Sequence, residues 1–84
     1  MLIEEEVIPD LARIQMEMDR DTDEYFITCE VKRVMSHLHA CVGPEEAERD
    51  YARMRAELLL CTRRMKRDTC FDLMAWRDKF QQRW

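Results

Sequence analysis

Apolar residues recur along two stretches of the chain at alternating steps of four and three residues. The first stretch contains Ile27, Val31, Val34, Leu38 and Cys41. This spacing places the side chains on one face of a helix, so it predicts a helix over residues 22–42. Asp21, with Glu24 three residues later, suits the N-terminal cap of such a helix.

The second stretch lies in the C-terminal half and has the same rhythm. It contains Ala47, Tyr51, Met54, Leu58, Cys61 and Met65, and a related stripe continues with Leu73, Trp76 and Phe80. This pattern predicts a helix over residues 45–82, which could break near residues 68–69, where the stripe loses its apolar residue. A shorter stripe near the N-terminus predicts a helix over residues 9–20. No helix or strand is predicted for residues 1–8.

The Gly43-Pro44 pair is the strongest stop signal in the chain. Glycine suits the C-terminus of one helix and proline suits the first position of the next. Only one Gly and two Pro are present, and Ala, Glu, Lys, Leu and Arg make up 37 of the 84 residues. This composition is typical of long helices and disfavours many short strands. The sequence therefore predicts a single all-α domain over residues 1–84, a long antiparallel helical hairpin with coiled-coil-like packing. Its turn is at residues 43–44, and its first arm is broken near residues 20–22.

Charge is unevenly distributed between the two predicted arms. The net charge is −4, but residues 1–30 carry ten acids and two bases, whereas residues 31–84 carry twelve bases and eight acids. In the hairpin, an acidic cluster would lie opposite a basic one and would fix the antiparallel register. These clusters are Asp19, Asp21, Asp23 and Glu24 on the first arm, and Arg63, Arg64, Lys66 and Arg67 on the second.

Apolar side chains remain after the two main stripes have been paired. A two-layer hairpin cannot bury all of them, and exposed apolar patches of this kind mark protein interfaces. We therefore expect a small non-enzymatic binding module, such as a subunit, adaptor or inhibitor, that docks an apolar helix face on itself or on a larger protein. The expected partner-binding residues are Leu59, Leu60, Cys70, Phe71, Met74, Trp76, Phe80 and Trp84.

Four cysteines allow an alternative function, a disulfide-stapled structural hairpin in an oxidising compartment. Two helices with two cysteines each are typical of the twin CX9C hairpins of the mitochondrial intermembrane space, but the gaps here are eleven and eight residues. We therefore expect reduced cysteines that pack as small apolar residues, in a cytoplasmic protein, and keep the intermembrane space as the alternative location.

A second alternative is a metal or redox sensor built on the sequence H-x-H-x-C at residues 37–41. On the predicted helix, His37 and Cys41 share a face while His39 points away, so a third ligand would come from elsewhere. No pattern indicates a catalytic residue, a cofactor or a small-molecule substrate. The negative net charge disfavours nucleic acid, and no apolar run is long enough to span a membrane.

Overall fold

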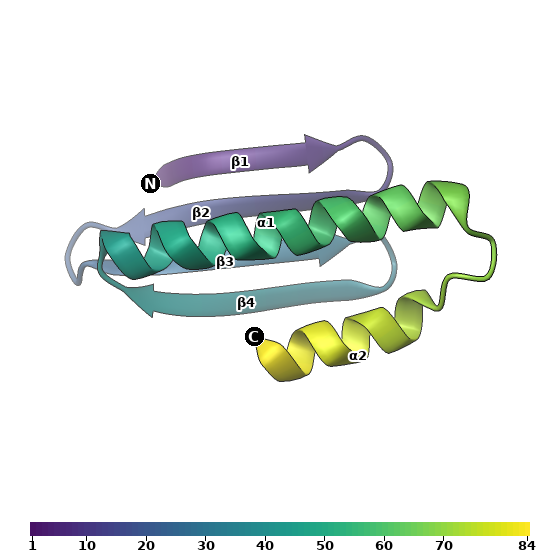
Figure 1. The fold of residues 1–84 in the computed structure, drawn as a ribbon. Helices are drawn as coiled ribbons and strands as arrows, with labels where there is room; N and C mark the ends of the chain where they lie inside the picture. The colour runs from purple at the N-terminus through teal and green to yellow at the C-terminus, as the bar shows by residue number, and fades with distance from the viewer.

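The computed structural model describes residues 1–84 and contains a four-stranded antiparallel sheet and two helices (Figure 1). The strands follow one another in the order β1-β2-β3-β4, so each pairs with its neighbour in sequence. The helices lie on one side of this sheet. The elements are β1 (Leu2–Ile8), β2 (Ala12–Asp19), β3 (Glu24–Val31), β4 (Met35–Val42), α1 (Pro44–Arg67) and α2 (Leu73–Arg83).

The all-α helical hairpin is therefore wrong, and with it the coiled-coil packing. Residues 9–20 and 22–42, expected to be helical, form β2, β3, β4 and the turns between them. In β2 and β3 the buried residues alternate with exposed or half-buried ones, with a period of two. The spacing from Ile27 to Val31 fits a helix and a strand equally well, because four residues are one helical turn and also two strand repeats.

One face of the sheet forms the apolar core together with α1. The strands contribute Ala12, Ile14, Met16, Tyr25, Ile27, Cys29, Val31, Met35 and Cys41. Against them pack Ala47, Tyr51, Met54 and Leu58, which recur along α1 at helical spacing. The stripe in this part of the sequence is thus the buried face of α1, but it packs on a sheet instead of a second helix.

The turns between strands are built without glycine. Asp10, Asp23 and Arg33 each adopt a positive φ, at 66°, 57° and 65° respectively. Aspartate tolerates this left-handed conformation better than most residues do. A chain with a single glycine can therefore still form a meander of short strands.

The helices begin at residues suited to their first turns. Gly43, with a φ of 86°, precedes Pro44 at the start of α1, where the missing proline N–H costs nothing. Asp72 caps α2 by accepting a hydrogen bond from the Ala75 backbone N–H at 3.0 Å.

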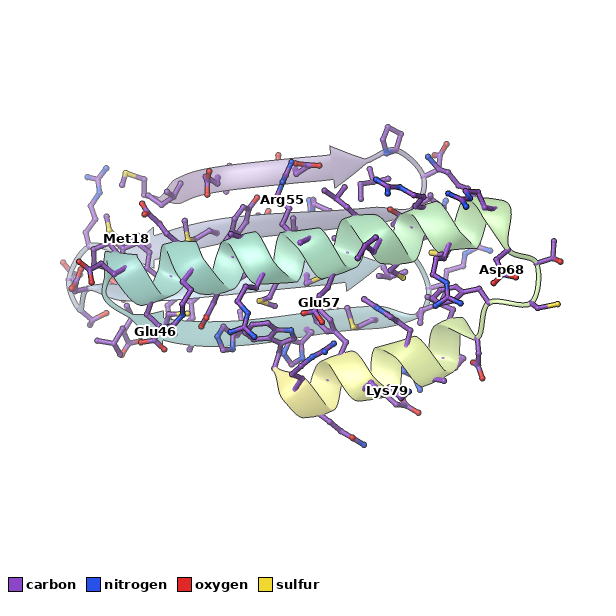
Figure 2. The ribbon with its side chains drawn as sticks, in the orientation of Figure 1. Met18, Glu46, Arg55, Glu57, Asp68 and Lys79 are labelled. Carbon is purple, nitrogen blue, oxygen red and sulfur yellow. The ribbon has the colours of Figure 1, made fainter.

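Ion pairs join α1 to its neighbours on both sides. In Figure 2, Arg55 lies on the side of α1 nearest β1, where it pairs with Glu6, and Glu57 lies on the side nearest α2, where it pairs with Arg83.

The predicted contact between the acidic and basic clusters is also wrong. The turn with Asp19, Asp21, Asp23 and Glu24 lies at the start of α1, because the Gly43 N–H donates to the Asp23 carbonyl. The cluster of Arg63, Arg64, Lys66 and Arg67 lies at the other end of this 24-residue helix, about 30 Å away at 1.5 Å per residue (Figure 1). Arg64 instead pairs with Asp68 and stacks over Phe71.

Truncation of one residue on each sheet face distinguishes this fold from the helical hairpin. Ile27 is fully buried and Leu38 is 62% exposed, although the helical stripe placed both in the core. We expect Ile27→Ala to lower the free energy of unfolding by about 2–5 kcal/mol and Leu38→Ala to change it by less than about 0.5 kcal/mol. Urea denaturation of the two variants measures both values. Similar large losses for both variants would favour a helix with a shared stripe.

Candidate functional site

The sheet has a second face that no helix covers (Figure 1). Strand register places the side chains of this face in rows: Phe26 pairs with Ala40, Thr28 with Leu38, and Glu24 with Val42. Leu38 is 62% exposed and Val42 is 71% exposed. We call the whole uncovered surface the open face, and its β3–β4 half is an apolar strip in contact with solvent.

Acidic residues lie beside the apolar strip, on β1 and β2 and at the two ends of β3. The strand register places on the open face the charged residues Glu5, Arg13, Glu17, Asp19, Glu24 and Glu30. Arg13 is the single base among them, and its guanidinium pairs with the Glu30 carboxylate at 2.8 Å. The open face thus combines an apolar strip along β3 and the edge strand β4 with a negatively charged margin on β1, β2 and the ends of β3.

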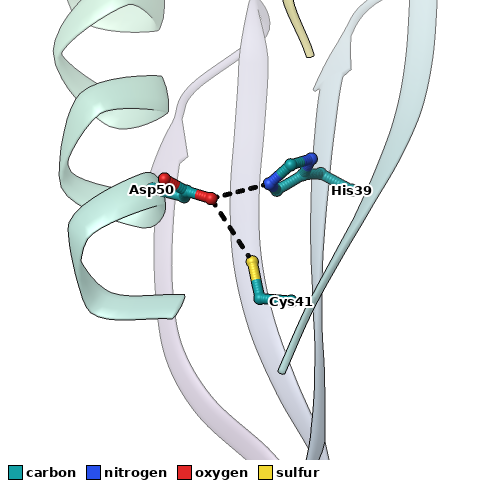
Figure 3. A group of neighbouring side chains, drawn as sticks. All are labelled: His39, Cys41 and Asp50. Carbon is teal, nitrogen blue, oxygen red and sulfur yellow. Dashed lines mark hydrogen bonds and ion pairs between the residues drawn. The ribbon is translucent and has the colours of Figure 1, made fainter. Parts of the chain in front are cut away.

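A polar cluster lies on the opposite, helix-covered side of the sheet, where β4 meets α1 (Figure 3). The His39 ring Nε2 lies 2.8 Å from Oδ2 of Asp50, and the Cys41 thiol donates to the same oxygen at 3.6 Å. Arg49 donates to the other carboxylate oxygen at 3.3 Å. The three potential ligand atoms of His39, Cys41 and Asp50 all lie within 4.8 Å of one another.

Strand and helix periodicity bring this cluster together. His39 and Cys41 are two residues apart on β4, so both side chains point toward α1. Asp50 lies next to Tyr51 on the buried face of α1, in its second turn. Cys41 and Asp50 are buried, and the His39 side chain is 17% exposed.

Helix α2 covers the histidines of β4 with aromatic rings. His37 meets Phe80 edge to face at 5.8 Å, and His39 meets Trp84 edge to face at 5.3 Å. Phe80 and Trp84 are four residues apart, a rise of about 6 Å along a helix, and His37 and His39 are two residues apart, a rise of about 6.6 Å along a strand. The aromatic rings are therefore spaced like the histidines that they contact. The Trp84 indole N–H also donates to Glu57 on α1 at 2.7 Å.

Burial and hydrogen bonding shift the acidity of the cluster in opposite directions. Burial and the neighbouring Asp50 carboxylate raise the pKa of Cys41 to about 11. Burial alone would also raise the pKa of Asp50, but hydrogen bonds from His39, Arg49 and Cys41 outweigh it and keep this pKa below its ordinary value. The carboxylate is therefore ionised at neutral pH, and the thiol keeps its proton.

The structure distributes the expected partner-binding residues over several environments. Phe80 is fully buried, Leu60 is 57% exposed and Met74 is 50% exposed. Cys70 is exposed, and the remaining four residues are half-buried: Leu59, Phe71, Trp76 and Trp84. These residues do not form one helix face, because they belong to α1, α2 and the connection between them.

Two members of the polar cluster, His39 and Asp50, were not predicted from the sequence. His39 was expected to point away from Cys41, but on a strand residues 37, 39 and 41 share one face. Asp50 was not singled out, although it lies three residues after Ala47 and four before Met54, on the apolar face of the helix. The ring of His37 does not belong to the cluster; its Nε2 is buried without a hydrogen-bond partner.

The sequence matches no protein-family model, and the chain has no significant match among curated proteins or solved structures. Neither helix has the length and apolar character needed to cross a membrane. The function must therefore be argued from the open face and the polar cluster themselves.

Thiol reactivity tests the environments of the four cysteines, which are free in the structure. Cys70 is exposed, whereas Cys29, Cys41 and Cys61 are buried, and burial raises the pKa of Cys29 to about 12 and that of Cys61 to about 11. Thiolates are the reactive form, so we expect iodoacetamide to modify one thiol in the folded protein and four in denaturant. Intact mass spectrometry counts the adducts.

The Cys70→Ser variant is the control, and it should show no rapid adduct while folded. Rapid modification of a second thiol in the folded protein would contradict the burial described here. Fewer than four reactive thiols in denaturant would instead favour the disulfide-stapled alternative.

Proposed function

We propose that this protein is a small non-enzymatic binding module that docks its open face on another protein. The observation that supports this proposal is the uncovered sheet face, on which Leu38 and Val42 are exposed along the edge strand β4. Contiguous exposed apolar surface is unfavourable in water, and in soluble proteins it marks interaction sites.

The size of the open face indicates how much of it a partner must contact. Strands of seven or eight residues in a four-stranded sheet cover roughly 26 Å by 19 Å. A stable complex buries about 800 Å² of accessible surface on each partner. The open face is thus about 490 Å² in projection, and the apolar strip of β3 and β4 is about half of it, so a stable complex must include the acidic margin and some surface beyond the sheet.

The acidic margin defines the chemistry of the partner. A second copy of this chain would place Glu17, Glu24 and their acidic neighbours against like charges or against the apolar strip. A protein surface with an apolar centre and flanking Lys or Arg side chains would complement both parts of the open face. We therefore infer a basic protein partner and expect the isolated chain to be monomeric.

Two matched substitutions distinguish docking through the sheet from docking through the helices. Leu38→Asp introduces a charge into the open face, and Leu60→Asp makes the same change at a residue of α1 with similar exposure, 57% against 62%. A partner identified with the unaltered chain should bind Leu60→Asp normally and bind Leu38→Asp at least about tenfold more weakly, since a charge would be buried unpaired. Titration calorimetry with the purified partner measures both affinities.

The affinity for the unaltered chain should also fall as salt is raised, because acidic and basic side chains face each other. Binding that Leu60→Asp abolishes and Leu38→Asp leaves intact would transfer the interface to the helix side. A stable homodimer that Leu38→Asp dissociates, measured by light scattering, would contradict the inferred basic partner.

A further inference from the structure

The cluster of His39, Cys41 and Asp50 is independent of the open face, because it lies on the other side of the sheet, between β4 and α1. We propose that His39 Nε2, Cys41 Sγ and Asp50 Oδ2 form a binding site for a divalent transition-metal ion, and that Zn²⁺ is the ion that fits it best.

The donor set selects the class of metal. Imidazole nitrogen, thiolate sulfur and one carboxylate oxygen are the three ligand types that Zn²⁺ uses in proteins. Ca²⁺ and Mg²⁺ prefer oxygen ligands, so a site with one sulfur and one nitrogen disfavours them. Three protein ligands leave one position of a tetrahedral ion for water or another small ligand.

Two of the three distances within the cluster require only small adjustments, and the third, from His39 Nε2 to Cys41 Sγ, lies within 4.8 Å and must shorten by up to about 1.3 Å. Bond lengths of about 2.0–2.3 Å around tetrahedral Zn²⁺ separate the ligand atoms by roughly 3.3–3.7 Å. The Cys41 Sγ to Asp50 Oδ2 distance of 3.6 Å already lies in this range. The His39 Nε2 to Asp50 Oδ2 distance of 2.8 Å must open by about half an ångström, which a side-chain rotation achieves, as the ion replaces the hydrogen bond.

Charge balance favours a dication at this position. When Zn²⁺ binds, the Cys41 thiol loses its proton to solvent, and the neutral His39 ring gives up its Nε2 proton to solvent and takes one on Nδ1. The new bonds then join the metal to the thiolate, the carboxylate and the imidazole Nε2. The two positive charges of the ion are then balanced by one thiolate and one carboxylate. The ion and its three ligands together are then neutral, and the charge of Arg49, whose side chain is 64% exposed, stays in contact with water, so no isolated charge is buried.

Neighbouring residues hold the ligands in position. Arg49 binds the second oxygen of Asp50 at 3.3 Å and leaves Oδ2 for the metal. The Trp84 ring packs against His39, and Glu57 on α1 fixes this indole. Such outer contacts orient the ligands of metal sites.

Titration with Zn²⁺ under reducing conditions tests the proposal. The chain should bind one ion, and Cys41→Ser and His39→Gln should each weaken binding at least about tenfold, the smallest loss typical even of outer-shell changes. Cys70→Ser is the matched control, because it removes an exposed thiol far from the cluster, and it should bind as the unaltered chain does. Calorimetry gives the stoichiometry and affinity, and circular dichroism confirms that each variant is folded.

Co²⁺ provides a second readout that does not require the ligand variants Cys41→Ser and His39→Gln to fold. In the Cys70→Ser protein, Co²⁺ should produce a thiolate-to-metal absorption band in the near ultraviolet and quench the fluorescence of the nearby Trp84. Zn²⁺ should reverse both changes. The proposal is overturned if Zn²⁺ shows no saturable binding, if the folded Cys41→Ser variant binds it undiminished, or if the Co²⁺ complex lacks the thiolate band.

Discussion

One-sided burial is the constraint on which the rest of this structure depends. The sheet presents apolar residues such as Ile14, Ile27 and Val31 on a single face, and α1 covers that face with its own apolar stripe. Neither element can bury its apolar surface alone, so sheet and helix stabilise each other. With only one long helix, the opposite sheet face remains in solvent. The same packing thus creates the core and leaves the open face available to a partner.

The second helix depends on the polar part of the covered face. In the middle of β4, histidines replace the aliphatic residues that fill the centre of the sheet, and Phe80 of α2 and Trp84, the C-cap of this helix, pack against their rings. This packing places the C-terminal end of α2 over the polar cluster, in which His39 and Cys41 contact the Asp50 carboxylate. A buried ionised carboxylate requires such partners. The cluster therefore joins β4, α1 and α2, and a metal ion bound there would strengthen the same junction.

The sequence was informative for the C-terminal half and misleading for the N-terminal half. The stripe from Ala47 to Leu58 does form the buried face of α1, but the same rhythm from Ile27 to Cys41 belongs to strands, so the spacing alone did not separate helix from strand. In β2 and β3 the alternation of Ile14 with Met16 and of Ile27 with Cys29 is the strand signal. It was hidden because the strands are short and their turns use Asp10, Asp23 and Arg33 instead of glycine. The polar cluster was missed for the same reason, since His39 and Cys41 share a face only on a strand.

Backbone nuclear Overhauser contacts test the central claim, the meander with one covered face, most directly. The strand register predicts that Ile27 lies beside Met16 on one side and beside His39 on the other. We expect cross-strand contacts between backbone protons of these residues, together with strong sequential contacts from Hα to the next N–H along β3. Continuous contacts between successive N–H protons through residues 22–42, without cross-strand contacts, would show a helix there and would contradict the account.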